Sequence, residues 1–426
     1  MEKTDRCYGQ YVQILREELL PAMGCTEPIA VAYAAAKARE TLGKMPERVI
    51  VEASGNIIKN VKSVVVPNTG GLKGIPAAAA AGAAAGDAAA ELQVLASVTP
   101  EQVSAIGDFL AKTPIELRHA DTPHIFDIAV SVFSGGESAY VRITDFHTNI
   151  VCIRRNDETL YEKTEDGGSG KETLTDRSCM SVERIVDFAD SVDLEDVRAL
   201  LQKQIDCNMA IAEEGLTNSY GANIGKTLLK GHEGDISYKL RAWAAAGSDA
   251  RMNGCEMPVV INSGSGNQGI TTSVPVIVYA RETGASEEQL LRALCVSNLV
   301  TIHLKTGIGR LSAYCGAVSA GAGAASGVAY LQGGRFEVIA HTIVNTVAVT
   351  SGIVCDGAKA SCAAKIAAAV DAGLLGLAMY RGGNEFFGGD GIVKKGVERT
   401  IEIVGKLASR GMVETDKEII RLMMEN

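Results

Sequence analysis

The stretch HIFDIAVSVFSGGESAYVRITDFHTNIVCIRR, residues 124–155, decides the fold class because it interrupts an otherwise helical pattern. It contains three runs rich in β-branched and aromatic residues, and SGGES, residues 134–138, joins the first two. We interpret these runs as a small antiparallel β-rich subdomain. The polar, glycine-containing segment at 156–176 follows as a linker.

The sequence on both sides of this stretch has mainly helical signals. Thr26 precedes a predicted helix over 27–42, and Thr99 and Gln102 have the spacing of a capping box. The segments RVIVEAS and VKSVVV favour a strand pair near 47–66. Further helices are predicted over residues 4–20, 76–94, 181–190, 194–215, 236–250, 286–300, 315–332, 336–350 and 362–378.

These signals predict an α+β fold with a mostly helical catalytic body. We expect residues 1–115 and 180–426 to form this body, and residues 116–179 to form the inserted β-rich subdomain and its linker. The chain has 46 glycines and abundant alanine, and such small side chains let helices pack closely. The same Ala- and Gly-rich helix faces are compatible with a homodimer.

Composition excludes several classes of function. The net charge of −10, without a run of Lys or Arg, argues against nucleic-acid binding. The polar start MEKTDRCYGQ lacks the apolar core of a signal peptide. The most membrane-like window, residues 338–355, contains His341 and Asn345 and favours a buried core helix over a membrane span. We therefore expect a cytoplasmic protein whose ten cysteines are reduced thiols.

Three cysteines stand among small residues near predicted helix starts. Cys315 precedes GAVSAGAGAASG, Cys355 follows 40 residues later, and Cys362 comes seven residues after that. Small neighbours leave room for an inorganic cluster, and positive helix ends favour the thiolate form that ligates metal. No compact CxxC run supports this interpretation, so three buried structural thiols are the alternative.

Two further segments could contribute to a site. Cys25, in MGCTEPIA, directly precedes a predicted helix, whose positive end favours a thiolate able to accept a proton. The polar loop INSGSGNQGITTSVP, residues 261–275, offers Ser263, Asn267, Gln268 and backbone N–H groups to a carboxylate or phosphate. The alternative for Cys25 is a buried cysteine at a turn, and the alternative for residues 261–275 is a plain connection between helices.

Several motifs together resemble the L-cysteine desulfidases, a family of catabolic iron–sulfur enzymes. A more distant likeness connects the chain to the catalytic alpha portion of iron–sulfur L-serine dehydratases. The likeness covers nearly the whole chain. The motifs that carry it are GCTEPIA, SGNIIKN, VVVPNTGG, NSGSGNQG, YCGAVSAGAGAASG, CDGAKASC and GGDGIV.

The resemblance implies a site and a reaction. Cys315, Cys355 and Cys362 match the ligands of a [4Fe-4S] cluster with one open iron, Cys25 matches the proposed proton acceptor, and SGSGNQG resembles part of the substrate pocket. The implied reaction converts the small molecule L-cysteine to sulfide, pyruvate and ammonia, without pyridoxal phosphate. In the serine dehydratases the last two ligands stand further apart, which favours cysteine over serine or threonine as the substrate.

Two other interpretations remain at this stage. The first is a pyridoxal-phosphate lyase with the same net reaction, although Lys359 and Lys365 stand beside the proposed cluster instead of in a convincing Schiff-base setting. The second is a non-catalytic amino-acid-binding relative, in which the β-rich subdomain would bind a regulatory amino acid.

Overall fold

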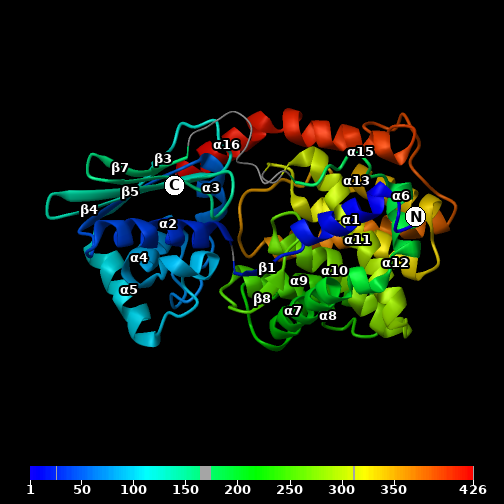
Figure 1. Ribbon diagram of the computed structural model, residues 1–426. Coiled ribbons are helices and arrows are strands. Elements are labelled where there is room, and N and C mark those ends of the chain that lie inside the picture. Colours follow the sequence, from blue (N-terminus) through cyan, green and yellow to red (C-terminus); the bar gives the residue numbers. More distant parts are fainter. Residues whose placement is uncertain (25, 164–173, 310–311, 426) are drawn as a thin grey trace.

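The chain forms two lobes that lie side by side in the computed structural model, an α/β lobe and a helical lobe (Figure 1). The structure describes residues 1–24, 26–163, 174–309 and 312–425. Helices predominate, and a six-stranded sheet and a two-stranded sheet accompany them. The predicted α+β class is therefore confirmed.

The six-stranded sheet of the α/β lobe has the strand order β3-β2-β4-β5-β6-β7. The β2 and β3 strands are parallel, and the other neighbours are antiparallel. Gly135 and Gly136, both with positive φ, form the two-residue turn between β4 and β5. The strands are β2 (Arg48–Ala53), β3 (Ile115–His119), β4 (Asp127–Ser134), β5 (Glu137–Thr144), β6 (Ile150–Arg155) and β7 (Glu158–Glu162).

One face of this sheet packs on helix α2, with α4 and α5 beyond it (Figure 1). Alternate residues of the central strands, such as Val51, Val130 and Val141, are completely buried on this face. Thr99 and Gln102 form the predicted capping box of α5. The helices of this lobe are α2 (Thr26–Leu42), α3 (Gly55–Val61), α4 (Gly74–Ala85), the 3-10 helix η1 (Ala88–Gln93) and α5 (Pro100–Lys112).

The structure divides the buried apolar side chains differently from the expected domains. Residues between Ile29 and Ile143 share one core, because β2 pairs with both β3 and β4 and the sheet buries its face on α2. The expected boundary at 115/116 crosses this core. The strand pair near 47–66 was wrong in its second member, because residues 55–61 form α3 and Val65 makes only an isolated bridge to Lys73.

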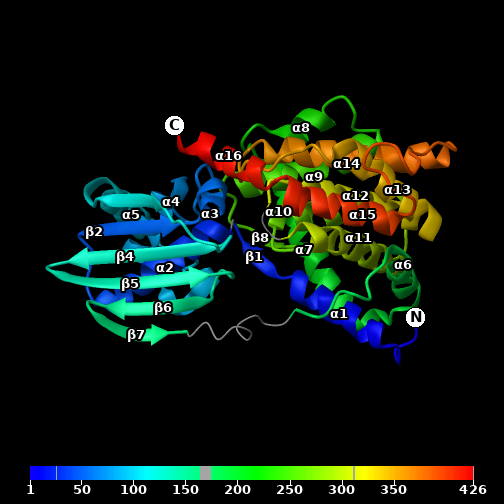
Figure 2. The same ribbon diagram turned by 90° about the horizontal axis from the view of Figure 1, so that it is seen from above.

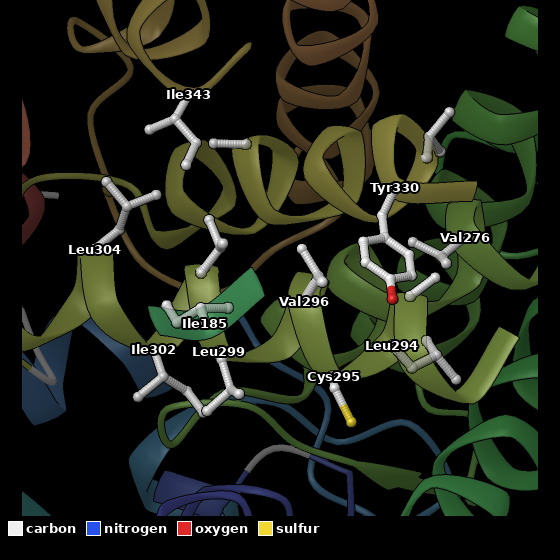
Figure 3. Close-up of a cluster of buried hydrophobic side chains, with 14 of the residues drawn as sticks. Ile185, Val276, Leu294, Cys295, Val296, Leu299, Ile302, Leu304, Tyr330 and Ile343 are labelled. Atoms are coloured by element: carbon white, nitrogen blue, oxygen red, sulfur yellow. The ribbon is translucent and has the colours of Figure 1, made fainter. Parts of the chain in front are cut away.

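A second core holds the helical lobe together and combines residues 7–19 with residues 180–408. Figure 3 shows part of it, where α11 presents Val296 and Leu299 near Ile185. The elements are α1 (Arg6–Glu18), β1 (Pro21–Met23), α6 (Val182–Ser191), η2 (Leu194–Asp196), α7 (Arg198–Thr217), α8 (Ile224–Leu229), α9 (Ile236–Met252), β8 (Pro258–Val260), α10 (Gly266–Thr283), α11 (Glu287–Ile308), α12 (Gly316–Leu331), α13 (Phe336–Thr350) and α14 (Cys362–Arg381).

The last helices connect the two lobes. Helix α15 (Val397–Lys406) lies on the helical lobe, and a π-helical turn, η3 (Leu407–Gly411), leads into α16 (Val413–Met424). Figure 2 shows α16 reaching from α15 toward α3 of the α/β lobe. Ile420 packs against Gly55, and Lys59 of α3 forms an ion pair with Asp416 of α16. Helix α16 therefore connects the helical lobe to the α/β lobe.

Helix α14 is the one helix in the described residues that is long and apolar enough to cross a bilayer by length and composition alone. Half of its apolar window is buried inside the protein, where α14 packs on α9, α12 and α13. The segment expected to be most membrane-like contributes α13, which has 15 residues. A core helix of this kind is weak evidence for a membrane span.

Close backbone contact between α2 and α4 gives a prediction about stability. A Cβ atom on Gly82 would lie 2.0 Å from the carbonyl oxygen of Ala32. We expect Gly82→Ala to lower the free energy of unfolding by about 2 kcal/mol, because the helices must separate and overpacking costs roughly 1–3 kcal/mol. Urea titration followed by far-ultraviolet circular dichroism measures the change.

The same substitution at Gly107 is the matched control. Gly107 lies in α5, and nothing lies within 4 Å of the Cβ position there. Gly107→Ala should raise the free energy of unfolding by up to about 1 kcal/mol, because alanine favours helix. Equal effects at the two positions would contradict the close contact.

Candidate functional site

A cavity of about 130 Å³ lies where the two lobes meet. The α/β lobe contributes Glu27 from the first turn of α2 and Lys59 from the last turn of α3 to its lining. The helical lobe contributes residues from α9, α10, α12, α14 and the connections between them. All three cysteines of the predicted cluster site, Cys315, Cys355 and Cys362, line this one cavity.

Backbone pairing positions Cys315 and Cys355. The N–H of Cys315 donates to the carbonyl of Ile353 at 3.1 Å, and the N–H of Cys355 donates to the carbonyl of Ala313 at 2.6 Å. These bonds flank an antiparallel bridge between Tyr314 and Val354. Two cysteines 40 residues apart in the sequence therefore lie on neighbouring segments.

Cys362 completes the set as the first residue of α14, a helix that packs against α12. Its Sγ lies 3.7 Å from the carbonyl oxygen of Gly357. Gly357 has φ +92° and leaves no room for a side chain, since a Cβ there would lie 2.1 Å from the carbonyl oxygen of Lys59. In the described residues, no three His, Cys, Asp or Glu side chains are grouped for a single metal ion.

Two thiols of this cavity, Cys315 and Cys362, favour the protonated form when no cation is bound. Burial, together with the neighbouring Cys355 and Cys362, raises the pKa of Cys315 to about 12. Burial also raises the pKa of Cys362. The expectation that helix starts favour thiolate was wrong for these two residues, because desolvation outweighs the helix dipole. Binding a metal here must release protons.

Lysines next to the cysteines are held by Asp356. Burial would raise the pKa of Asp356, but hydrogen bonds from Lys359 and Lys365 outweigh it and hold the pKa at about 2. Lys365 also donates to the carbonyl of Val354 at 2.9 Å and lines the cavity. Both lysines therefore support the cysteine-bearing loop through their ion pairs with Asp356.

The polar loop predicted over 261–275 is a short turn followed by a helix. The side chain of Ser265 accepts from the N–H of Gln268 and caps α10, which begins at Gly266. Asn267 and Gln268 lie in the first turn of this helix and line the cavity. Ser263 does not. Its hydroxyl donates to Asn262 at 2.9 Å, and it lines a second cavity with Arg177 and Thr306.

Cys25 lies outside the described residues, and its role as proton acceptor stays a prediction. Its neighbours are close to the site. Thr26 and Glu27 line the cavity, and the carbonyl of Gly24 accepts a hydrogen bond from Arg251 at 2.9 Å.

Sequence reasoning missed three basic residues of the cavity lining, Lys59, Arg251 and Lys305. The side chain of Lys59 is only 1% exposed, and its partner Asp416 comes from α16. Arg251 lies in the last turn of the Ala-rich helix α9 and is also buried. A charged residue inside an alanine-rich segment was the available signal for Arg251, and the quoted motif SGNIIKN already contained Lys59.

Comparisons with known proteins agree on one family. The profile described as "Serine dehydratase alpha chain" matches residues 89–421. A "UPF0597 protein" of Desulfitobacterium hafniense is 58% identical over 424 residues, covering 100% of this chain and 98% of that protein. Proteins of the same description from Treponema denticola and Fusobacterium nucleatum are 50% and 46% identical, over 98% and 97% of this chain and 98% of each relative.

Proposed function

Because this chain belongs to the family of iron–sulfur serine dehydratase alpha chains, we propose that it is a lyase of the L-cysteine desulfidase type. The observation that carries the proposal is the meeting of three thiols and the start of α10 in one cavity. In the proposed reaction, a base removes the α-proton of L-cysteine and the Cβ–S bond breaks. Its electron pair leaves with sulfur as sulfide. The aminoacrylate formed tautomerises and is hydrolysed to pyruvate and ammonia.

The residues of the cavity fit an iron–sulfur cluster. Cys315, Cys355 and Cys362 supply the sulfur ligands that iron prefers. Burial raises the pKa of Cys315 and Cys362, so a nearby positive charge favours their ionisation. Gly316 and Gly357 keep the surrounding walls small. A [4Fe-4S] cluster held by three thiolates leaves one iron open and, when bound, supplies Lewis acidity to a substrate thiol.

The chain's own groups bind the substrate and move its proton. Asn267 and the N–H groups at the start of α10 are positioned for a carboxylate, and Gln268 lies beside them in the cavity lining. Stabilising charge on that carboxylate makes the α-proton easier to remove. Cys25 is the proposed proton acceptor. The site at the junction of the lobes also limits the access of water to the reacting atoms.

The alternative substrate within this family is L-serine, with water in place of sulfide as the leaving group. The match to serine dehydratase alpha chains favours it. The separation of seven residues between Cys355 and Cys362 favours L-cysteine, in keeping with the resemblance described above. A sulfur-ligated iron also suits a soft thiolate leaving group.

The proposed cellular setting is the cytoplasm. The nine cysteines in the described part of the chain are all free thiols, which suits a reducing compartment. The partner is proposed to be the small amino-acid substrate, with no nucleic-acid or membrane partner, and the Ala- and Gly-rich helices are compatible with a homodimer.

The deciding experiment uses protein reconstituted with iron and sulfide without oxygen. We expect L-cysteine to give pyruvate and sulfide in equal amounts, with kcat/KM at least about tenfold above that for L-serine. A sharp visible band that survives air would instead indicate a pyridoxal-phosphate Schiff base. Preference for serine would make the protein a dehydratase, and absence of pyruvate from both amino acids would overturn the lyase assignment.

A further inference from the structure

Two buried polar atoms in the lining of the cavity lack hydrogen-bond partners among the described residues. One is the Nε of Arg251, a donor, and the other is the Oε1 of Gln268, an acceptor. Buried polar atoms in folded proteins are nearly always paired, so an unpaired one calls for an explanation. Here a donor and an acceptor are both unpaired in the cavity that contains the three cysteines.

The guanidinium of Arg251 keeps its positive charge without a carboxylate partner in the described parts of the chain. The residue is 6% exposed. Its Nη2 donates to the carbonyl of Gly24 at 2.9 Å, and its Nη1 donates to the side-chain oxygen of Asn267 at 3.3 Å. Both acceptors are neutral. A buried cation held in this way favours an anion as its missing partner.

The start of α10 lies directly against this guanidinium. A Cβ atom on Gly266 would lie 2.3 Å from Nε of Arg251, so only glycine leaves this space open. Gly266 is the first residue of an 18-residue helix, whose first N–H groups lack partners within the helix and carry a partial positive charge. The Arg251 donor and the helix start therefore favour the same ligand, a carboxylate.

The amide of Gln268 lies against the residue that follows Cys315. A Cβ atom on Gly316 would lie 2.6 Å from Cδ of Gln268. Gln268 is 5% exposed, so its free oxygen requires a donor inside the cavity. An ammonium group is a donor of this kind.

We propose that this cavity recognises both charged ends of an α-amino acid. Arg251 and the start of α10 bind the α-carboxylate, and Gln268 accepts a hydrogen bond from the α-ammonium group. Because Gln268 lies against Gly316, this arrangement directs the β-substituent of the substrate toward the cysteines. The inference rests on the proposed function and adds Arg251 as a residue that determines specificity.

Two substrate analogues separate the two contacts. Both keep the thiol: 3-mercaptopropionate keeps the carboxylate without the ammonium, and cysteamine keeps the ammonium without the carboxylate. Calorimetry on the anaerobically reconstituted protein measures their dissociation constants. We expect Arg251→Met to weaken binding of 3-mercaptopropionate roughly 10- to 100-fold and to leave cysteamine unchanged. Gln268→Leu should weaken binding of cysteamine and leave binding of 3-mercaptopropionate unchanged.

Arg251→Lys keeps a positive charge but lacks Nε in the planar fork, and it should weaken 3-mercaptopropionate binding less than Arg251→Met does. Arg251→Lys is the variant to measure if Arg251→Met does not fold. Arg241→Met is the matched control on the same helix, since Arg241 pairs with Asp371 and does not line the cavity. This control should bind both analogues like the parent.

The outcomes distinguish the two proposals. Equal weakening of both analogues in either variant, or no weakening in any, would overturn the recognition scheme while leaving the lyase assignment intact. Failure of the parent protein to bind either analogue, together with absence of pyruvate from L-cysteine, would remove the proposed function and the inference together.

Discussion

Cys315→Ser is expected to abolish both cluster binding and activity. The substitution removes one of three thiols that line the cavity, at the position where backbone bonds hold Cys315 beside Cys355. Because loss of an outer-shell group around a metal typically costs 10- to 100-fold, we expect loss of a ligand to lower kcat/KM at least about 100-fold. Iron content and the broad brown absorbance after anaerobic reconstitution should fall with activity.

Cys207→Ser is the matched control for this prediction. Cys207 is a partly exposed thiol on α7 that does not line the cavity. Its serine variant should bind iron and release sulfide as the parent does. Parental iron content and parental activity in the Cys315 variant would remove the cluster from the proposed mechanism.

Asp416→Ala should lower the free energy of unfolding by about 3 kcal/mol. Asp416 is the ion-pair partner of Lys59, whose side chain is 1% exposed. Removing one member of a buried pair costs roughly 3–5 kcal/mol, because the other charge is left without compensation. Urea titration followed by circular dichroism measures the change.

A double substitution and an exposed neighbour sharpen this test. Lys59→Met combined with Asp416→Leu removes both charges and should recover most of the lost stability. Lys417→Ala is the control one residue further along α16, where the Lys417 side chain is 67% exposed, and it should change stability by no more than about 0.5 kcal/mol. A parental free energy of unfolding in Asp416→Ala would show that the pair does not fasten α16 to α3.

The sequence predicted the cysteines of the site better than the surfaces that complete it. The sequence showed the small residues beside Cys315, Cys355 and Cys362 and their spacing. The structure brings all three cysteines to one cavity. The sequence did not predict that Arg251 lines the cavity. The role of Arg251 depends on the start of α10, which contacts the guanidinium through Gly266 and becomes visible only after folding.

Helix α10 was missed because its local signals oppose helix formation. It begins with glycine and contains threonines and Pro275, residues with low helix propensity. Burial of most of its residues stabilises it instead. The α3 helix was read as part of a strand pair for a similar reason, since the β-branched residues around it suggested a strand. Tertiary packing outweighed local preference in both segments.

The large separation of Lys59 and Asp416 in the sequence has a consequence for the folding of a newly made chain. The two are 357 residues apart, so at ribosomal speeds of roughly 5–20 residues per second Lys59 waits about 20–70 s for its partner. Until then the Lys59 side chain lacks its ion-pair partner, and the surface of α3 that α16 covers is open to water. Docking of α16 is therefore a late step of folding, because its contacts with α3 form only after α16 has been made.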